Sequence, residues 1–95
     1  MDEELIKILK EMFLKEATTS VETLVDLESE ENYKEMAALT HKLIGQSRII
    51  GEEVFALICE EIERAIEDQD KQLISEKLPF LKKNLEYFRI NRLIW

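Results

Sequence analysis

Apolar residues recur at intervals of three and four along almost the whole chain, which is the spacing of one face of an α-helix. The first such stretch runs from about residue 3 to residue 27, and a break near Glu16 would divide it into a short leading helix and a longer one. Its apolar positions are Leu5, Leu9, Met12, Phe13, Ala17, Val21, Leu24 and Val25. Ser29 is a suitable N-cap for a second helix from Glu30 to about Ile50, which Gly51 would end.

Three further stripes complete the pattern. The second helix has inward positions Met36, Leu39, Thr40, Leu43, Ser47 and Ile50; the third has Phe55, Ile58, Cys59, Ile62 and Ile66; the fourth has Ile74, Leu78, Leu81, Leu85 and Phe88. A polar turn at residues 67–70 separates the last two, and Asp70 can cap the fourth helix. Pro79 lies inside that helix and is expected to kink or restart it. The pattern predicts an all-α, antiparallel, up-down-up-down four-helix bundle.

Composition narrows the class of protein. A chain of 95 residues and 11.2 kDa holds one domain, residues 1–95, and two glycines and one proline leave little material for β-hairpins. The net charge of −8 repels phosphate backbones and anionic lipid, so we expect neither nucleic-acid binding nor membrane-surface binding. No apolar run approaches the ~18 residues of a membrane span.

The ends of the chain and its one cysteine suggest a location. The start, MDEELIKILK, is acidic and does not resemble a signal peptide, and a single cysteine fits a reducing compartment. We therefore expect a cytoplasmic protein. The last residues, RINRLIW, are apolar for a free end, so we expect them to pack down or to continue into a longer protein.

Candidate chemistry centres on His41, the only histidine, in the middle of the second helix. It lies 100° or more around the helix from the inward residue Leu43, so the imidazole should face solvent. One turn on is Gly45, although glycine in a helix interior costs about 1 kcal/mol relative to alanine. One turn earlier is the small Ala37. The pattern predicts a single ring on a bare helix face that another macromolecule can approach closely.

The sequence lacks the residues that other kinds of active site require. A di-iron bundle needs Glu-x-x-His pairs, and a zinc site needs several Cys or His ligands where this chain has one of each. There is no glycine-rich phosphate loop and no serine triad, and 95 residues cannot hold the ATP-binding domain of a kinase. We expect no metal site or cofactor, and we interpret Cys59 as a small buried apolar residue.

The segment THKLIGQSRIIG, with His41, Leu43, Gly45, Ser47 and Gly51, resembles the histidine phosphotransfer (HPt) domains of bacterial and fungal phosphorelays. The resemblance covers about residues 5–90, and it is most specific over residues 36–67. It implies the same antiparallel four-helix bundle with a short extra N-terminal helix. It also implies that His41 accepts a phosphoryl group from the aspartyl phosphate of a receiver domain and passes it to another receiver aspartate.

The resemblance implies partners and site residues as well. The expected partners are response-regulator receiver domains, which would supply Mg²⁺, and an upstream hybrid histidine kinase; the domain itself is expected to be a monomer. In some family members an acidic or amide residue 22 positions after the histidine orients the ring, and that position here is Glu63, in ICEEIE (58–63). Because other acidic residues surround Glu63, a plain solvated face is the alternative.

Two positions depart from the family pattern. The residue three after the histidine is usually Lys or Arg and is Ile44 here; the fifth is often Ser or Ala and is Gln46 here. Arg48, two turns along the same face, could contact phosphate or the receiver in place of the missing cation, and Gln46 could donate a hydrogen bond to phosphate. For both residues an ordinary surface position is the alternative.

The expected partner-binding surface lies around the histidine. It comprises Met12, Phe13, Ala37, Lys42, Ile44, Gly45 and Arg48. Lys42 points roughly 100° away from His41 and is the weaker candidate. Ile44, with Met12 and Phe13, would form an apolar patch for the first helix of a receiver.

Two other functions stay open at this point. A bundle that binds a receiver or another helical partner without accepting phosphate would bind equally well after His41→Ala. A purely structural homodimer would show a mass that depends on concentration and would tolerate changes at Ala37 and Gly45.

Overall fold

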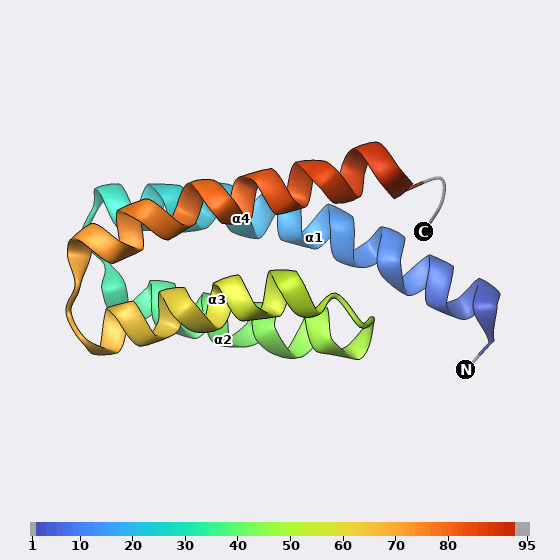
Figure 1. Ribbon diagram of the computed structural model, residues 1–95, viewed down its shortest axis with the longest axis horizontal. Helices are drawn as coiled ribbons and strands as arrows, with labels where there is room; N and C mark the ends of the chain where they lie inside the picture. The colour runs from blue at the N-terminus through green and yellow to red at the C-terminus, as the bar shows by residue number, and fades with distance from the viewer. Residues whose placement is uncertain (1, 93–95) are drawn as a thin grey trace.

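The computed structural model describes residues 2–92, which form four helices: α1 (Glu3–Ser29), α2 (Tyr33–Ile49), α3 (Glu53–Glu67) and α4 (Lys71–Asn91). Each helix packs against the next along the chain, and α4 packs back against α1. Successive helices run in opposite directions, with the α1–α4 pair lying over the α2–α3 pair (Figure 1). The predicted antiparallel up-down-up-down bundle is therefore confirmed. Leu93, Ile94 and Trp95, part of the apolar C-terminal stretch, lie outside the described residues.

The short extra N-terminal helix is a wrong prediction, because residues 3–29 form one uninterrupted helix. The weak helix formers Thr18–Ser20 cost only tenths of a kcal/mol each, and the apolar stripe continues through them from Ala17 to Val21. The Thr18 hydroxyl donates to the Leu14 carbonyl at 2.7 Å, which keeps it within the helix. The start of α1 extends beyond the other helices (Figure 1), so Leu5 stays exposed instead of joining the core.

Polar side chains and one glycine set the helix boundaries. Ser29 is not the N-cap of α2: its hydroxyl donates back to the Asp26 carbonyl, and it ends α1. Asn32 caps α2 instead by accepting from the Glu35 N–H, and Asp70 caps α4 as predicted by accepting from the Leu73 N–H. Gly51 follows α2 with a φ of 78°, the left-handed conformation in which a side chain would be strained.

Helix α4 continues through Pro79 without restarting. Proline removes one backbone donor and costs stability in a helix interior. Here Pro79 is exposed, and Leu78 and Leu81 on either side are buried. The apolar contacts of these two residues hold the segment in the bundle.

The core contains three phenylalanine rings from three helices. Phe13 of α1 and Phe55 of α3 meet edge to face with ring centroids 5.2 Å apart, and Phe88 of α4 completes the cluster. Thr40 and Ser47 of α2 are also fully buried, and each hydroxyl donates to a carbonyl one turn earlier. These residues fix the rotation of α2 about its axis, and this rotation determines where His41 points.

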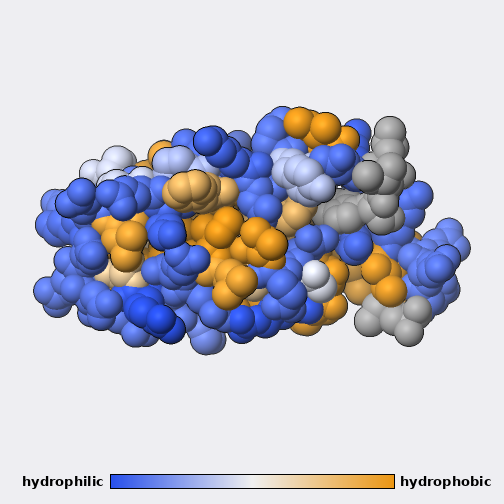
Figure 2. Space-filling view, in the orientation of Figure 1, coloured by the Kyte–Doolittle hydropathy of each residue, from blue (hydrophilic) through white to orange (hydrophobic). Residues whose placement is uncertain are grey.

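One face of the bundle, over α3 and α4, exposes hydrophobic side chains ringed by hydrophilic ones (Figure 2). The large apolar residues exposed on these two helices are Val54, Leu57, Phe80, Tyr87 and Ile90. In residues 2–92 no helix combines the length and the hydrophobicity that crossing a membrane requires.

Candidate functional site

His41 projects from α2 into solvent. Its predecessor Thr40 and the nearby Leu43 are fully buried, so the period of the helix turns His41 outward. The imidazole side chain is 80% exposed. The prediction that this ring faces water is confirmed, and the ring is accessible to another macromolecule.

The surface around the ring is bare. The residues three and four positions away on α2 are Ala37, Ala38, Ile44 and Gly45, none of which carries a charge or a polar side chain. A Cβ atom added at Gly45 would meet no atom within 4 Å. Packing inside this chain therefore does not require glycine there, and its effect is to leave open space beside the imidazole.

Glu63 of α3 contacts the imidazole. The antiparallel pairing of α2 with α3 brings Oε2 of Glu63 to 3.1 Å from Nδ1 of His41, and the Glu63 side chain is only 26% exposed. A carboxylate accepts hydrogen bonds and donates none, so the contact assigns the proton to Nδ1. In the neutral ring with this tautomer, the lone pair is on Nε2, the nitrogen on the opposite side of the ring from Nδ1.

Arg48 lies on the same side of α2 as His41 but is engaged elsewhere. Its guanidinium group forms an ion pair with Glu60 of α3 and lies 3.8 Å from Glu53. The structure thus places Arg48 next to the site with its charge already paired. A direct contact between Arg48 and a phosphoryl group stays a prediction.

Gln46 and Lys42 both turn toward Glu16 of α1. The Gln46 amide donates to Glu16 at 3.3 Å, and the Lys42 ammonium lies 3.8 Å from the same carboxylate. Both side chains thus border the site on its α1 side, opposite Glu63. A Gln46 hydrogen bond to phosphate also stays a prediction.

Two residues expected in the docking patch are core residues. Ile44 is only 8% exposed, because it lies one turn after the buried Thr40 and joins the same inward arc of α2. Phe13 is buried because it continues the inward stripe of α1 and packs against Phe55. Neither side chain forms the apolar surface beside the histidine that the sequence predicted.

Met12 does lie on the surface, with 59% of the residue exposed. It borders an open hollow of about 160 Å³ between α1 and α2. The hollow is lined by Leu9, Met12, Phe13, Glu16, Gln46, Ile49 and Ile50. An apolar hollow therefore exists on the surface between α1 and α2, and its exposed members come from the start of α1 and the end of α2.

Cys59 lies in the core one turn before Glu63. Burial raises the pKa of its thiol to about 12, and the negative charge of Glu63 adds to this rise. The thiol is therefore protonated at neutral pH, which confirms that Cys59 is a small buried residue and no nucleophile.

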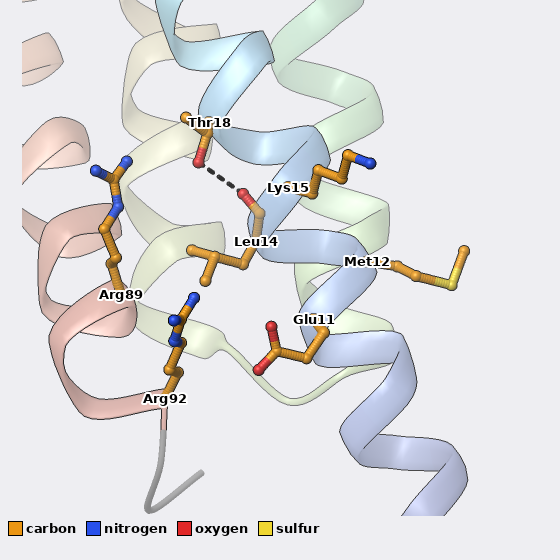
Figure 3. Close-up of a pocket in the computed structure, with 7 residues that line it drawn as sticks. All are labelled: Glu11, Met12, Leu14, Lys15, Thr18, Arg89 and Arg92. Carbon is orange, nitrogen blue, oxygen red and sulfur yellow. Dashed lines mark hydrogen bonds between the residues drawn. The ribbon is translucent and has the colours of Figure 1, made fainter.

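Other parts of the described chain offer less chemistry. No cluster of three or more His, Cys, Asp or Glu side chains in residues 2–92 could hold a metal ion. A wider hollow of about 570 Å³ lies between α1 and α4, where Arg89 and Arg92 lie on the side of Leu14 and Glu11, and Lys15 points away (Figure 3). Its lining includes no residue of α2 or α3, so this hollow is separate from the histidine site.

Sequence reasoning missed two carboxylates, Glu16 and Glu60, which engage the polar side chains around His41. Glu60 could have been found, because it precedes Glu63 by one turn and so shares its face of α3. Glu16 could not have been found in this way, since its position depends on the register between α1 and α2.

Comparison with known proteins identifies one family. A family model described as "Hpt domain" matches residues 8–90, which is most of the chain. No curated protein and no solved structure matches it.

Proposed function

Because the chain belongs to the Hpt domain family, the phosphotransfer modules of phosphorelays, we propose that His41 carries a phosphoryl group between the aspartates of receiver domains. The single observation that carries the proposal is the exposure and hydrogen bonding of the imidazole. The ring is 80% exposed and its Nδ1 is engaged by Glu63, so Nε2 is available to a partner.

The transfer step requires one nucleophile from this chain. The Nε2 lone pair attacks the phosphorus of an aspartyl phosphate in line, the phosphorus–oxygen bond to the aspartate breaks, and the carboxylate leaves with that electron pair. The next receiver aspartate reverses these bonds, and the lone pair returns to Nε2. Mg²⁺ belongs to the receiver, as part of the substrate complex, and would neutralise charge on the phosphoryl oxygens.

Glu63 would support this step in two ways. Its hydrogen bond fixes the ring orientation and the tautomer, so that the lone pair stays on Nε2. The ring gains positive charge as the nitrogen–phosphorus bond forms, and the nearby carboxylate stabilises that charge. Glu63 is therefore proposed as a positioning residue that acts through the imidazole.

The receiver would dock over the bare face of α2. Ala37 and Gly45 allow close approach to the ring, and the apolar hollow beside Met12 would bury part of the receiver's surface. Lys42 lies at the edge of this surface. We propose a monomeric cytoplasmic domain of this kind, with a hybrid histidine kinase upstream.

The test is transfer of labelled phosphate. A receiver domain carrying a labelled aspartyl phosphate is mixed with the protein and Mg²⁺, and acid-labile label on the protein is followed with time. We expect label on the wild type and none on His41→Gln, with the helix content of the variant unchanged because the ring is exposed.

Failure would take a recognisable form. If label stays on the receiver while the receiver binds wild type and His41→Ala with equal affinity, the domain is a binding module without phosphotransfer. If His41→Gln becomes labelled as fast as the wild type, another residue accepts the phosphoryl group. Either result contradicts the proposal.

A further inference from the structure

We propose that Glu60 sets how readily phospho-His41 gives up its phosphoryl group, by holding Arg48 away from that group and by adding its own negative charge nearby. This inference rests on the proposed function of His41. It assigns to Glu60 a role that acts on the phosphoryl group, whereas Glu63 acts through the imidazole ring.

The first observation is that two side-chain contacts between α2 and α3 lie close together along these helices. His41 contacts Glu63, and Arg48, two turns later on α2, contacts Glu60, one turn earlier on α3. Side chains on a helix lean toward its N-terminus, so Arg48 leans toward His41. The Arg48 side chain therefore extends from its own turn of α2 toward the turn that carries His41.

The second observation concerns the other charges around the ring. The four helical neighbours of His41 are uncharged, and the Lys42 ammonium lies beside Glu16 on the opposite side of α2. Lys34 and Arg48 lie two turns before and two turns after His41 on the same face of α2, and Arg48 is the one whose side chain leans toward the ring. Its guanidinium group is held by Glu60 and lies 3.8 Å from Glu53, and Glu60 is the partner nearer to Glu63 along α3.

The third observation is that the Arg48 and Glu60 side chains are only partly exposed to solvent. The Glu60 side chain is 33% exposed and that of Arg48 is 46% exposed, so solvent screens this pair only in part. A phosphoryl dianion on Nε2 competes with Glu60 for the guanidinium group and is repelled by the Glu60 carboxylate. Both effects favour departure of the phosphoryl group to an acceptor.

The experiment uses N-phosphoimidazole as the donor, because free imidazole is the same leaving group without protein neighbours. The nitrogen–phosphorus bond of the donor breaks, its electron pair returns to imidazole, and an equivalent bond forms on Nε2 of His41. Intact-mass spectrometry gives the phosphorylated fraction of the protein. The equilibrium constant is measured in excess imidazole, once starting from the unphosphorylated protein and once from the phosphorylated protein.

We expect Glu60→Gln to raise this equilibrium constant about threefold to fivefold, which is the range for a partly exposed ion pair. Glu61→Gln is the matched control. It removes the same charge from the next residue along α3, whose carboxylate pairs with Lys77 of α4 and not with Arg48. Its constant should change less than twofold. Adding Arg48→Gln to Glu60→Gln should remove most of the gain.

The outcomes separate the two proposals. If all variants are phosphorylated on His41 with one equilibrium constant, or if Glu61→Gln matches Glu60→Gln, the role of Glu60 is overturned and phosphotransfer by His41 stands. If no variant, including the wild type, gains phosphate on His41, both proposals are overturned.

Discussion

At the scale of single residues, the proposed transfer depends on two side chains that lie on different helices. In the proposed transfer the imidazole of His41 would supply the nucleophilic nitrogen, and the Glu63 contact would determine which nitrogen that is. The proposed step takes one nucleophile from this chain. A carrier with so few reacting parts can leave most of its surface to the partner.

Changing Glu63 should slow phosphotransfer without unfolding the bundle. Glu63→Ala removes the acceptor for Nδ1–H, so we expect the transfer rate from a phosphorylated receiver to fall about tenfold. Glu63→Gln keeps an acceptor without the charge and should lose less. Stopped-flow or quench-flow measurement of transfer tests this order, and equal rates for all three proteins would remove the role of Glu63.

The sequence predicted the contact between His41 and Glu63, and their roles in transfer stay predictions. The single histidine beside a mid-helix glycine identified His41, and the family spacing of 22 residues identified Glu63. The prediction was wrong for Ile44 and Phe13, which are buried. Helical periodicity gives the direction of the apolar stripe, but the width of the buried arc depends on how closely the neighbouring helices pack.

At the scale of helices and turns, the two glycines have opposite roles. Gly51 has a φ of 78° and ends α2 in a conformation that disfavours a side chain. Gly45 lies inside α2 with open space around it, where alanine would suit the helix better. One glycine is thus required by the backbone, and the other leaves His41 accessible.

The two alanine substitutions should therefore change stability in opposite directions. Gly51→Ala should lower the free energy of unfolding by about 1 kcal/mol, and Gly45→Ala should raise it by about 0.5–1 kcal/mol. Urea unfolding followed by circular dichroism measures both. A destabilised Gly45→Ala would show that α2 needs glycine there for packing.

A larger side chain at residue 45 separates stability from function. Gly45→Leu should fold at least as well as the wild type but transfer phosphate more slowly, because the side chain would stand beside the imidazole. Unchanged transfer by this variant would contradict the interpretation of the bare helix face.

Helix types were easier to predict than helix ends. The apolar stripes placed all four main helices, whereas Ser29 and Asn32 are both good caps and only the turn between α1 and α2 decides between them. The predicted break near Glu16 was wrong because tertiary packing along α1 outweighs a weak local propensity.

At the scale of the whole molecule, charge alternates around the bundle. Helices α1 and α3 carry more acidic than basic residues, and α2 and α4 carry more basic than acidic residues. Each helix therefore makes its most extensive contacts with helices of opposite net charge. This arrangement explains ion pairs such as Arg48–Glu60 and Lys77–Glu61, and it favours the observed order of the helices over one with like-charged neighbours.

The Cys59 thiol should report on the integrity of the whole core. Its pKa is raised to about 12 in the folded protein against 9.0 for an unperturbed thiol. Between these values the unfolded chain loses this proton and the folded chain keeps it, so rising pH favours unfolding. Stability should therefore fall more steeply above about pH 9 in the wild type than in Cys59→Ala, as measured by urea unfolding at several pH values. Equal slopes would contradict the assigned pKa.

The central claim is that Nε2 of His41 receives the phosphoryl group while Nδ1 stays bonded to Glu63. Because His41 is the only histidine, nitrogen-15 NMR of its ring, before and after incubation with a phosphorylated receiver, tests this claim directly. The account predicts a phosphorus-coupled Nε2 and a protonated Nδ1. A ring spectrum that does not change while the receiver loses its phosphate, or a phosphoryl group on Nδ1, would contradict it.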